Sequence, residues 1–155
     1  EQNRVVIGSS DDNFSMIYDL YKYSFPNAKI IKCSLKEAEI VKYFTNSFLA
    51  LKVSYANEFF WLCKKLDINY NTVINIATYD KRLGKSHFGV PGPDGKFGFG
   101  GTCLPKDLKA IINVFDNNDI ESYILKAVWE RNIIEDRVEK DWEKLIGRAV
   151  VKNDK

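Results

Sequence analysis

The stretch Ser34–Leu66, SLKEAEIVKYFTNSFLALKVSYANEFFWLCKKL, has the sequence pattern of a single long helix. Ser34 and Glu37 form the S-x-x-E pattern of a capping box, in which two side chains satisfy free backbone amides at a helix start. No glycine or proline interrupts the stretch, and these are the residues that most disfavour a helix interior. The sequence therefore predicts a mainly α-helical fold organised on this helix.

The predicted long helix is apolar on more than one face. A first stripe at helical spacing holds Ile40, Phe44, Phe48, Leu51, Tyr55, Phe59 and Leu62. A second stripe holds Val41, Leu49, Val53, Ala56 and Phe60. A helix that is apolar on several sides is buried on several sides. In a chain of this size, one side can face a second subunit; alternatively, the helix is the central core of a monomer.

Two short stretches near the N-terminus, Arg4–Gly8 (RVVIG) and Ala28–Lys32 (AKIIK), predict β-strands with a helical pattern between them. Two strands do not make a stable sheet alone. We therefore expect residues 1–33 to be the remnant of an N-terminal α/β domain, whose sheet edge these strands form. Residues 34–155 then make up a helical domain, which begins with the long helix.

Further helices are predicted at Asn71–Tyr79, from Pro105 onward, and over Ile120–Ile146, where Gly147 ends the last helix. Between them, Asp80–Thr102 holds glycines and prolines with almost no periodicity. A loop of this length is long for a compact domain, and such loops are often functional.

Charge and cysteine usage exclude several classes of protein. The formal net charge is only +2, which argues against a dedicated nucleic-acid or membrane surface. No stretch is long and apolar enough to span a bilayer. The three cysteines are odd in number and fit no zinc-ligand spacing, so we expect no metal site and free thiols. Free thiols indicate a reducing compartment, and we expect a cytoplasmic protein.

The stretch Gly98–Asp107, GFGGTCLPKD, is the strongest candidate for chemistry. Cys103 follows three glycines, which let a backbone approach a ligand closely, and precedes Pro105, which can begin a helix. The partial positive charge at a helix N-terminus stabilises a thiolate, so Cys103 is a candidate nucleophile. The alternative is a buried structural cysteine. The glycine spacing does not fit G-x-G-x-x-G, so this chain shows no nicotinamide-cofactor site of its own.

Three motifs together resemble the UDP-glucose/GDP-mannose dehydrogenase family. GFGGTCLPKD is similar to that family's cysteine motif, and Asp80–Gly84 (DKRLG) resembles its D-x-R-[IL]-G. Glu37–Glu58 resembles its helix with E-A-E-x-x-K, then Asn46 four residues later, then N-E. The motifs occur in the family's order, and the resemblance covers about residues 4–146.

The resemblance implies a reaction and a set of catalytic residues. The family oxidises the C6 alcohol of a nucleotide sugar to a carboxylate in two hydride transfers to NAD⁺. It implies that Cys103 adds to the aldehyde-level intermediate and forms a thioester after the second oxidation. It also implies that Lys42 and Asn46 stabilise the oxyanion at C6, and that Asp107 activates water for thioester hydrolysis. The alternative roles are a surface lysine for Lys42 and a first-turn cap for Asp107.

The resemblance also implies substrate contacts. Arg82 resembles the arginine that reaches the nucleotide sugar from the neighbouring subunit; the alternative is an exposed loop arginine. Phe99, Gly100 and Gly101 would offer backbone amides to the substrate, and Lys106 is a candidate cofactor contact. We expect a homodimer through the long helix, residues 35–66.

The chain departs from the family in ways that limit these expectations. The resemblance implies that residues 1–33 are the C-terminal remnant of the NAD-binding α/β domain and that residues 34–155 are the helical central domain, with the dimerisation helix and the catalytic cysteine. The rest of the NAD-binding domain and the carboxy-terminal domain are missing from this sequence, so we expect an isolated fragment without dehydrogenase activity. The loop Val90–Lys96 is longer than in some members, which leaves the substrate open. UDP-glucose is the preferred substrate, with GDP-mannose and UDP-N-acetylmannosamine as alternatives. A free-standing helical dimerisation or binding module without catalysis is the alternative from another class.

Overall fold

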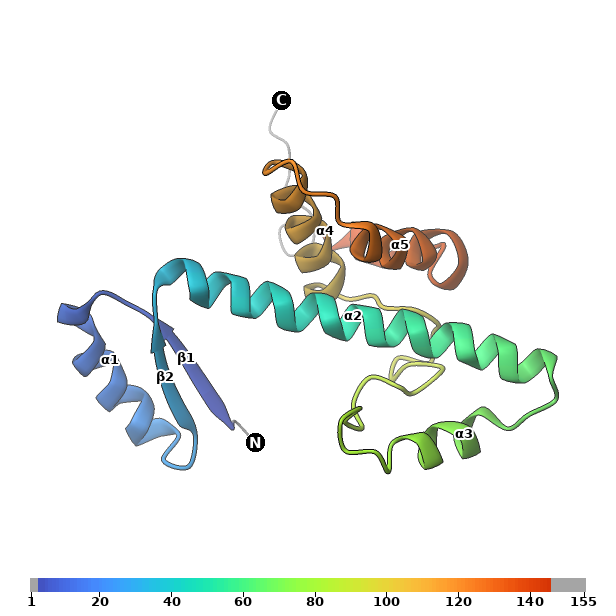
Figure 1. Ribbon diagram of the computed structural model, residues 1–155, viewed down its shortest axis with the longest axis horizontal. Helices are drawn as coiled ribbons and strands as arrows, with labels where there is room; N and C mark the ends of the chain where they lie inside the picture. The colour runs from blue at the N-terminus through green and yellow to red at the C-terminus, as the bar shows by residue number, and fades with distance from the viewer. Residues whose placement is uncertain (1–2, 146–155) are drawn as a thin grey trace. The chain divides into compact units, whose positions relative to one another are not determined.

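The computed structural model describes residues 3–145 and is mainly helical, as the sequence predicts (Figure 1). Its chain separates into two compact units, residues 1–45 and 46–155. The long helix α2 (Leu35–Lys65) runs through the point of division. A domain boundary between residues 33 and 34 stays a prediction.

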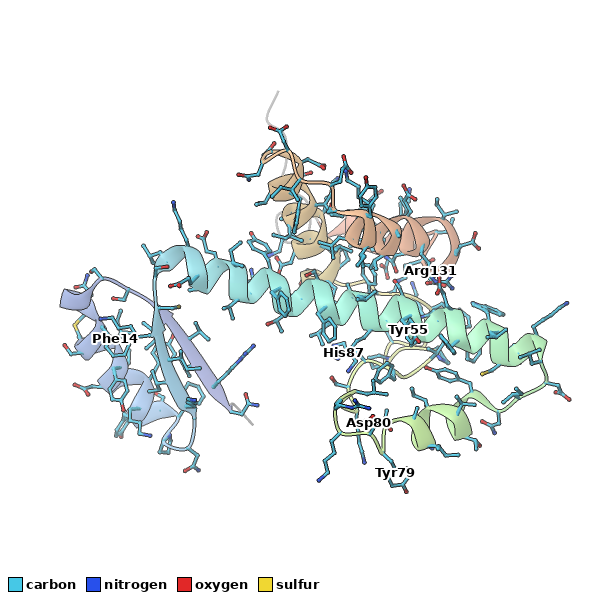
Figure 2. The ribbon with its side chains drawn as sticks, in the orientation of Figure 1. Phe14, Tyr55, Tyr79, Asp80, His87 and Arg131 are labelled. Atoms are coloured by element: carbon cyan, nitrogen blue, oxygen red, sulfur yellow. The ribbon has the colours of Figure 1, made fainter. Side chains whose placement is uncertain are left out.

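The first unit contains the two expected strands. Strand β1 (Arg4–Gly8) is followed by α1 (Asp11–Ser24) and β2 (Lys29–Cys33), and the strands pair in parallel with Arg4 opposite Lys29. Parallel neighbours need a crossover, which α1 supplies. The apolar contact between helix and sheet consists of Val5, Ile7, Ala28, Phe14, Ile17 and Ile30. Figure 2 labels Phe14 on the sheet-facing side of α1.

The start of α2 confirms the predicted capping box. The Ser34 backbone N–H donates to the Glu37 carboxylate at 2.7 Å, and the Glu37 N–H donates to the Ser34 hydroxyl at 3.2 Å. These hydrogen bonds lower the pKa of Glu37. Gly8 ends β1 against this turn, where an added Cβ would lie 2.8 Å from the Cβ of Ala38. The turn from β2 into α2 therefore needs a glycine at the end of β1.

In the second unit, α2 packs against α3 (Tyr70–Ala77) and the segment that follows it. The core here consists of Ala56, Cys63, Tyr70, Phe88 and Val90, with Phe60, Val73, Ile74 and Phe97 partly buried against it. Asn69 caps α3 by accepting hydrogen bonds from the amides of Asn71 and Thr72. Residues 78–102 form the expected long loop, which leads from α3 to α4.

The C-terminal region consists of α4 (Cys103–Asp116) and α5 (Tyr123–Arg131), which contact one another. Leu108, Ile111, Ile112, Val128 and Trp142 are buried in this part of the chain. The Trp129 and Trp142 rings lie 5.8 Å apart.

The prediction of one long helix over Ile120–Ile146 is wrong. Helix α5 starts only at Tyr123, and after Arg131 the chain widens into a π-helical turn, η1 (Asn132–Asp136). A short 3₁₀ turn, η2 (Asp141–Lys144), follows, and Lys140 before it is left-handed with φ 44°. The helix ends early because the side chains around residues 132–137 are used in tertiary contacts with the cysteine loop. Gly147 lies outside the described residues.

Within the described part of the chain, no helix combines the length and apolar character needed to cross a membrane. The second apolar stripe of α2 faces protein, with Ala56 buried and Leu49, Val53 and Phe60 partly buried. The first stripe is largely uncovered: in the second unit it exposes Phe48, Tyr55, Phe59 and Leu62. We call these four residues the exposed α2 stripe.

Candidate active site

Cys103 is the first residue of α4 and its side chain is exposed to solvent. Its Sγ lies 3.7 Å from the Thr102 hydroxyl oxygen. Pro105 occupies the first turn of α4, as expected, where its missing N–H costs no helical hydrogen bond. The thiol is thus accessible at a helix N-terminus, which is the placement that the sequence predicts for a nucleophile.

Asp107 lies one turn after Cys103 and is 1% exposed. Its carboxylate accepts a hydrogen bond of 2.5 Å from the side-chain amide of Asn46 on α2. The ammonium of Lys106 lies 3.5 Å from the other carboxylate oxygen and is itself partly exposed. The structure therefore brings together three residues that the sequence analysis singles out separately.

The glycine loop before Cys103 is held by side chains that the sequence analysis misses. Asn57 on α2 accepts from the Gly98 N–H, and Asn132 at the start of η1 bonds both the N–H and the carbonyl of Phe99. Phe99 is 3% exposed. Its amide is thus engaged within the protein, and a substrate contact at Phe99 stays a prediction. Asn57 belongs to the N-E motif, but no sequence pattern indicates Asn132.

Gly101 lies on the open side of this loop. It has φ +70°, and an added Cβ would meet nothing within 4 Å. Gly100 is different, because an added Cβ there would lie 2.5 Å from the guanidinium carbon of Arg137. Gly101 is therefore required by its backbone conformation, and Gly100 is required by the packed side chain of Arg137. Both glycines come shortly before the exposed thiol of Cys103.

Arg82 lies in the loop after α3, and its side chain is 88% exposed. Its guanidinium contacts Asp80, with Nη2 at 2.5 Å from Oδ2 and Nε at 3.0 Å from Oδ1. These bonds lower the pKa of Asp80. Figure 2 shows Asp80 and Tyr79 in this loop. An exposed, forked cation is free of the core and is suited to contact a carboxylate or phosphate from outside.

Lys42 lies on the part of α2 that belongs to the first unit, one helical turn before Asn46. Its ammonium lies 5.6 Å from the centroid of the Tyr43 ring. A role for Lys42 at the thiol stays a prediction.

The middle of α2 carries a buried cation that the sequence analysis does not single out. Lys52 is 8% exposed, and its ammonium donates to the Leu83 carbonyl at 3.1 Å and lies 4.3 Å from the centre of the Phe88 ring. Burial lowers the pKa of Lys52. Desolvation, and secondly the charge of Lys52, lower the pKa of His87 in the same loop. Lys52 thereby ties both DKRLG and the segment after it to α2.

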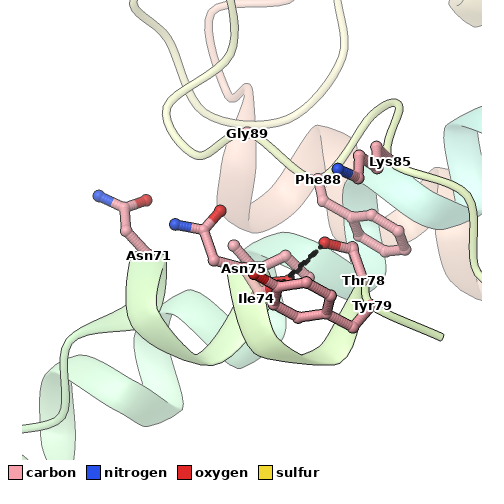
Figure 3. A pocket seen from close by; sticks show the side chains of 8 residues that line it. All are labelled: Asn71, Ile74, Asn75, Thr78, Tyr79, Lys85, Phe88 and Gly89. Atoms are coloured by element: carbon pink, nitrogen blue, oxygen red, sulfur yellow. Dashed lines mark hydrogen bonds between the residues drawn. The ribbon is translucent and has the colours of Figure 1, made fainter.

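A pocket of about 450 Å³ lies between α3 and this segment (Figure 3). It is lined by Asn71, Ile74, Asn75, Thr78, Tyr79, Lys85, Phe88 and Gly89. The predicted catalytic residues are not among its lining. Over residues 3–145, no group of three or more His, Cys, Asp or Glu side chains is placed to hold a metal ion.

Comparisons with known proteins place this site in context. Residues 36–133 match the model described as the UDP-glucose/GDP-mannose dehydrogenase family, central domain. The chain is 35% identical to a UDP-glucose 6-dehydrogenase of Rickettsia conorii over 130 residues, and 36% identical to one of Pseudomonas aeruginosa over 132. Each match covers 84% of this chain but only 29% and 28% of those proteins.

Among solved structures, the chain is similar to a UDP-glucose dehydrogenase from the hyperthermophilic archaeon Pyrobaculum islandicum, with 40% identity and a TM-score of 0.75. That match covers 84% of this chain and 29% of the archaeal chain. The chain thus spans less than a third of the length of these relatives.

Proposed function

Because the chain belongs to the UDP-glucose/GDP-mannose dehydrogenase family, we propose that it is the cysteine-bearing central segment of a nucleotide-sugar 6-dehydrogenase that oxidises UDP-glucose to UDP-glucuronate. The observation that carries the proposal is the exposed Cys103 at the start of α4, one turn from the buried Asp107–Asn46 pair. A free thiol, a fixed carboxylate and an amide donor are the groups that thioester chemistry at an aldehyde carbon needs.

Cys103 is the proposed nucleophile. Its sulfur adds to the C6 aldehyde carbon, forming a C–S bond while the carbonyl π electrons move to oxygen, which takes up a proton. The product is a hemithioacetal, which keeps the reactive aldehyde bound to the protein. The amides of the first turn of α4 stabilise the thiolate that attacks.

Asp107 is the proposed base for hydrolysis of the later thioester. We propose that this buried carboxylate, held by the amide of Asn46, accepts a proton from water as the water attacks the thioester carbon. The C–S bond then breaks and the thiol of Cys103 is restored. Lys42 is proposed to stabilise the developing oxyanion, together with Asn46.

NAD⁺ is the oxidant that the family uses, and the described residues do not fit a site for it. The turn between β1 and α1 contains one glycine, Gly8, where the dinucleotide fingerprint requires three. The cofactor is therefore proposed to be bound by another part of the whole protein, with Lys106 as the candidate contact from this chain. This chain then contributes the covalent and hydrolytic steps.

The exposed α2 stripe supports the proposal of a homodimer. Phe48, Tyr55 and Leu62 are 51%, 53% and 50% exposed. A second copy of α2 is the proposed cover for this face, and an extended Arg82 would then reach the nucleotide sugar of the partner subunit. The same exposed face also suits a dimerisation module without catalysis, which is the second candidate function.

The test is a chimeric enzyme in which the flanking domains of the Pseudomonas aeruginosa relative enclose this segment. We expect NADH formation with UDP-glucose, and a faster rate than with GDP-mannose or UDP-N-acetylmannosamine. The Cys103→Ser variant is expected to lose turnover to UDP-glucuronate. A folded chimera whose turnover survives that substitution would exclude the nucleophile, and a folded chimera that is inert with all three sugars would favour the module.

A further inference from the structure

The four residues Phe97–Gly100 precede the cysteine turn without belonging to a helix or strand, and polar side chains hold their backbone. Asn57 accepts a hydrogen bond of 3.3 Å from the Gly98 N–H. Arg137 donates from Nη1 to the Phe97 carbonyl at 3.3 Å. These contacts come from α2 and from the end of η1, so distant parts of the second unit meet at this loop.

Asn132 makes the closest of these contacts. Its Oδ1 accepts from the Phe99 N–H at 2.8 Å, and its Nδ2 donates to the Phe99 carbonyl at 2.9 Å. Asn132 is 0% exposed. This is the pairing that a residue of an adjacent antiparallel strand would give, supplied here by a single side chain.

The backbone conformation at the end of α5 points the Asn132 side chain at Phe99. Helix α5 widens at Asn132 into the π turn η1, which the Arg137 N–H closes by donating to the Asn132 carbonyl at 2.7 Å. Gly98 fits against η1 only because it has no side chain: an added Cβ would overlap Asn132 Oδ1 and lie 2.8 Å from the Cβ of Asp136. π turns inside helices are frequent at functional sites, where they re-aim side chains.

We propose that Asn132 is a positioning residue for Cys103. By fixing the Phe99 peptide groups, it leaves only Gly100, Gly101 and Thr102 between a rigid point and the helical turn that carries the thiol. The inference rests on the proposed function, since it assigns Asn132 to the reaction through the placement of the nucleophile. It adds a residue from the C-terminal part of the chain to a site otherwise built by α2 and α4.

The chemistry of the contact selects asparagine. A carboxylate at this position would keep the acceptor for the Phe99 N–H but would set a negative oxygen against the Phe99 carbonyl. An alanine would leave both buried groups of Phe99 without the amide, which costs the desolvation of each.

The test compares Asn132→Ala and Asn132→Asp with Asn118→Ala in this chain. Asn118 is a matched control, because its side-chain amide donates to the Val114 carbonyl at 2.8 Å at the opposite end of α4. Three quantities are measured: hydrogen exchange of the Phe99 amide by NMR, the amide chemical shifts of Gly100 and Gly101, and the rate of Cys103 alkylation by iodoacetamide, read by peptide mass spectrometry.

For Asn132→Ala we expect Phe99 exchange to rise by about tenfold or more, as the loss of buried hydrogen bonds implies. We expect the amide chemical shifts of Gly100 and Gly101 to change. We also expect Cys103 alkylation at pH 7 to slow about threefold, because this rate ratio corresponds to the free energy by which a helix N-terminus stabilises a negative charge. Asn118→Ala should change none of the three. If Asn132→Ala does not fold, the same three measurements on Asn132→Asp test the proposal.

The proposal is overturned if Phe99 exchange rises while Cys103 alkylation and the glycine shifts stay at their wild-type values. Asn132 would then support the loop without placing the thiol. These measurements use no substrate, so this outcome is distinct from failure of the dehydrogenase assignment, which is read from turnover.

Discussion

The side-chain amide of Asn46 donates to the buried carboxylate of Asp107 over 2.5 Å, and this one hydrogen bond joins α2 to α4 one turn after Cys103. A carboxylate that is 1% exposed needs such donors, because burying a charge without them is costly. The bond therefore stabilises the second unit, and it holds the proposed base at a fixed place one helical turn after Cys103.

Replacing Asn46 by alanine is expected to destabilise the chain. The variant loses a hydrogen bond to a buried charged group, so the free energy of unfolding should fall by about 2 kcal/mol. Urea unfolding followed by circular dichroism measures this. The control is Asn75→Ala, an exposed asparagine on α3. Equal unfolding midpoints for the two variants would show that the Asn46–Asp107 bond carries no stability.

Tyr70 gives a prediction at alkaline pH. Its hydroxyl donates to the Phe88 carbonyl at 2.7 Å, and burial raises the pKa of Tyr70 to about 12. The folded state thus favours the neutral phenol, and its stabilising effect is complete below the unfolded pKa of about 10 and is lost as the pH rises toward 12. Tyr70→Phe should cost about 1 kcal/mol at pH 8.

The difference in unfolding free energy between wild type and Tyr70→Phe should therefore shrink between pH 10 and 12. Tyr23→Phe is the control, because Tyr23 on α1 is 89% exposed and lies outside the exposed α2 stripe. A difference that stays constant to pH 12 would mean that the phenol of Tyr70 is not held neutral by the fold.

The acidic side chains around Arg137 predict a loss of stability in acid. Arg137 is 2% exposed and donates to Asp94 at 2.5 Å and to Asp141 at 2.7 Å. The hydrogen bonds from Arg137 lower the pKa of both carboxyl groups. Their contribution is therefore complete above the unfolded pKa of about 3.9 and is lost as the pH falls through the lower folded values.

Asp94→Asn should remove part of this acid dependence, so that its unfolding free energy changes less than that of wild type as the pH falls from 5 toward 2. Urea titrations across that range measure the two slopes. Asp19→Asn, an exposed residue of α1, is the control. Parallel curves for wild type and Asp94→Asn would contradict the assigned ion pair.

The exposed α2 stripe predicts the oligomeric state. We expect the chain to sediment as a dimer and Phe48→Glu to sediment as a folded monomer, because a buried charge at an apolar interface is unpaired. The control is Tyr123→Glu on α5, where the tyrosine is 76% exposed. A dimer that persists in Phe48→Glu, or a monomeric wild type at high concentration, would count against α2 as the interface.

Local rules predict much of this fold. Ser34 and Glu37 identify the start of α2 because a capping box satisfies backbone amides within four residues. Pro105 and the preceding glycines place Cys103 at a helix N-terminus for equally local reasons. Such local rules do not predict the early end of α5, because the apolar residues of 120–146 have helical spacing throughout. What breaks the helix is the engagement of Asn132 with Phe99 and of Arg137 with Asp94, partners more than thirty residues away.

The candidate site also contains some residues that the sequence predicts and some that it does not. Cys103, Asp107 and Asn46 are found by motif, and the structure brings Asn46 and Asp107 into contact. The residues that hold the loop are not found, because an asparagine in a helical stretch gives no sign that a distant backbone uses its amide. Lys52 has a weak signal in the sequence, because it is a lysine between apolar neighbours on a buried face of the helix.

Protection of Cys103 by the proposed aldehyde intermediate tests directly whether this thiol is the nucleophile. The chain is treated with iodoacetamide in the presence or absence of the 6-aldehyde of UDP-glucose, and alkylation at each cysteine is read by peptide mass spectrometry. We predict that the aldehyde slows alkylation of Cys103 reversibly and more than propanal does at equal concentration, while alkylation of Cys33 is unaffected. Alkylation of Cys103 at the same rate with the nucleotide-sugar aldehyde as with propanal would contradict the claim that this thiol is the nucleophile.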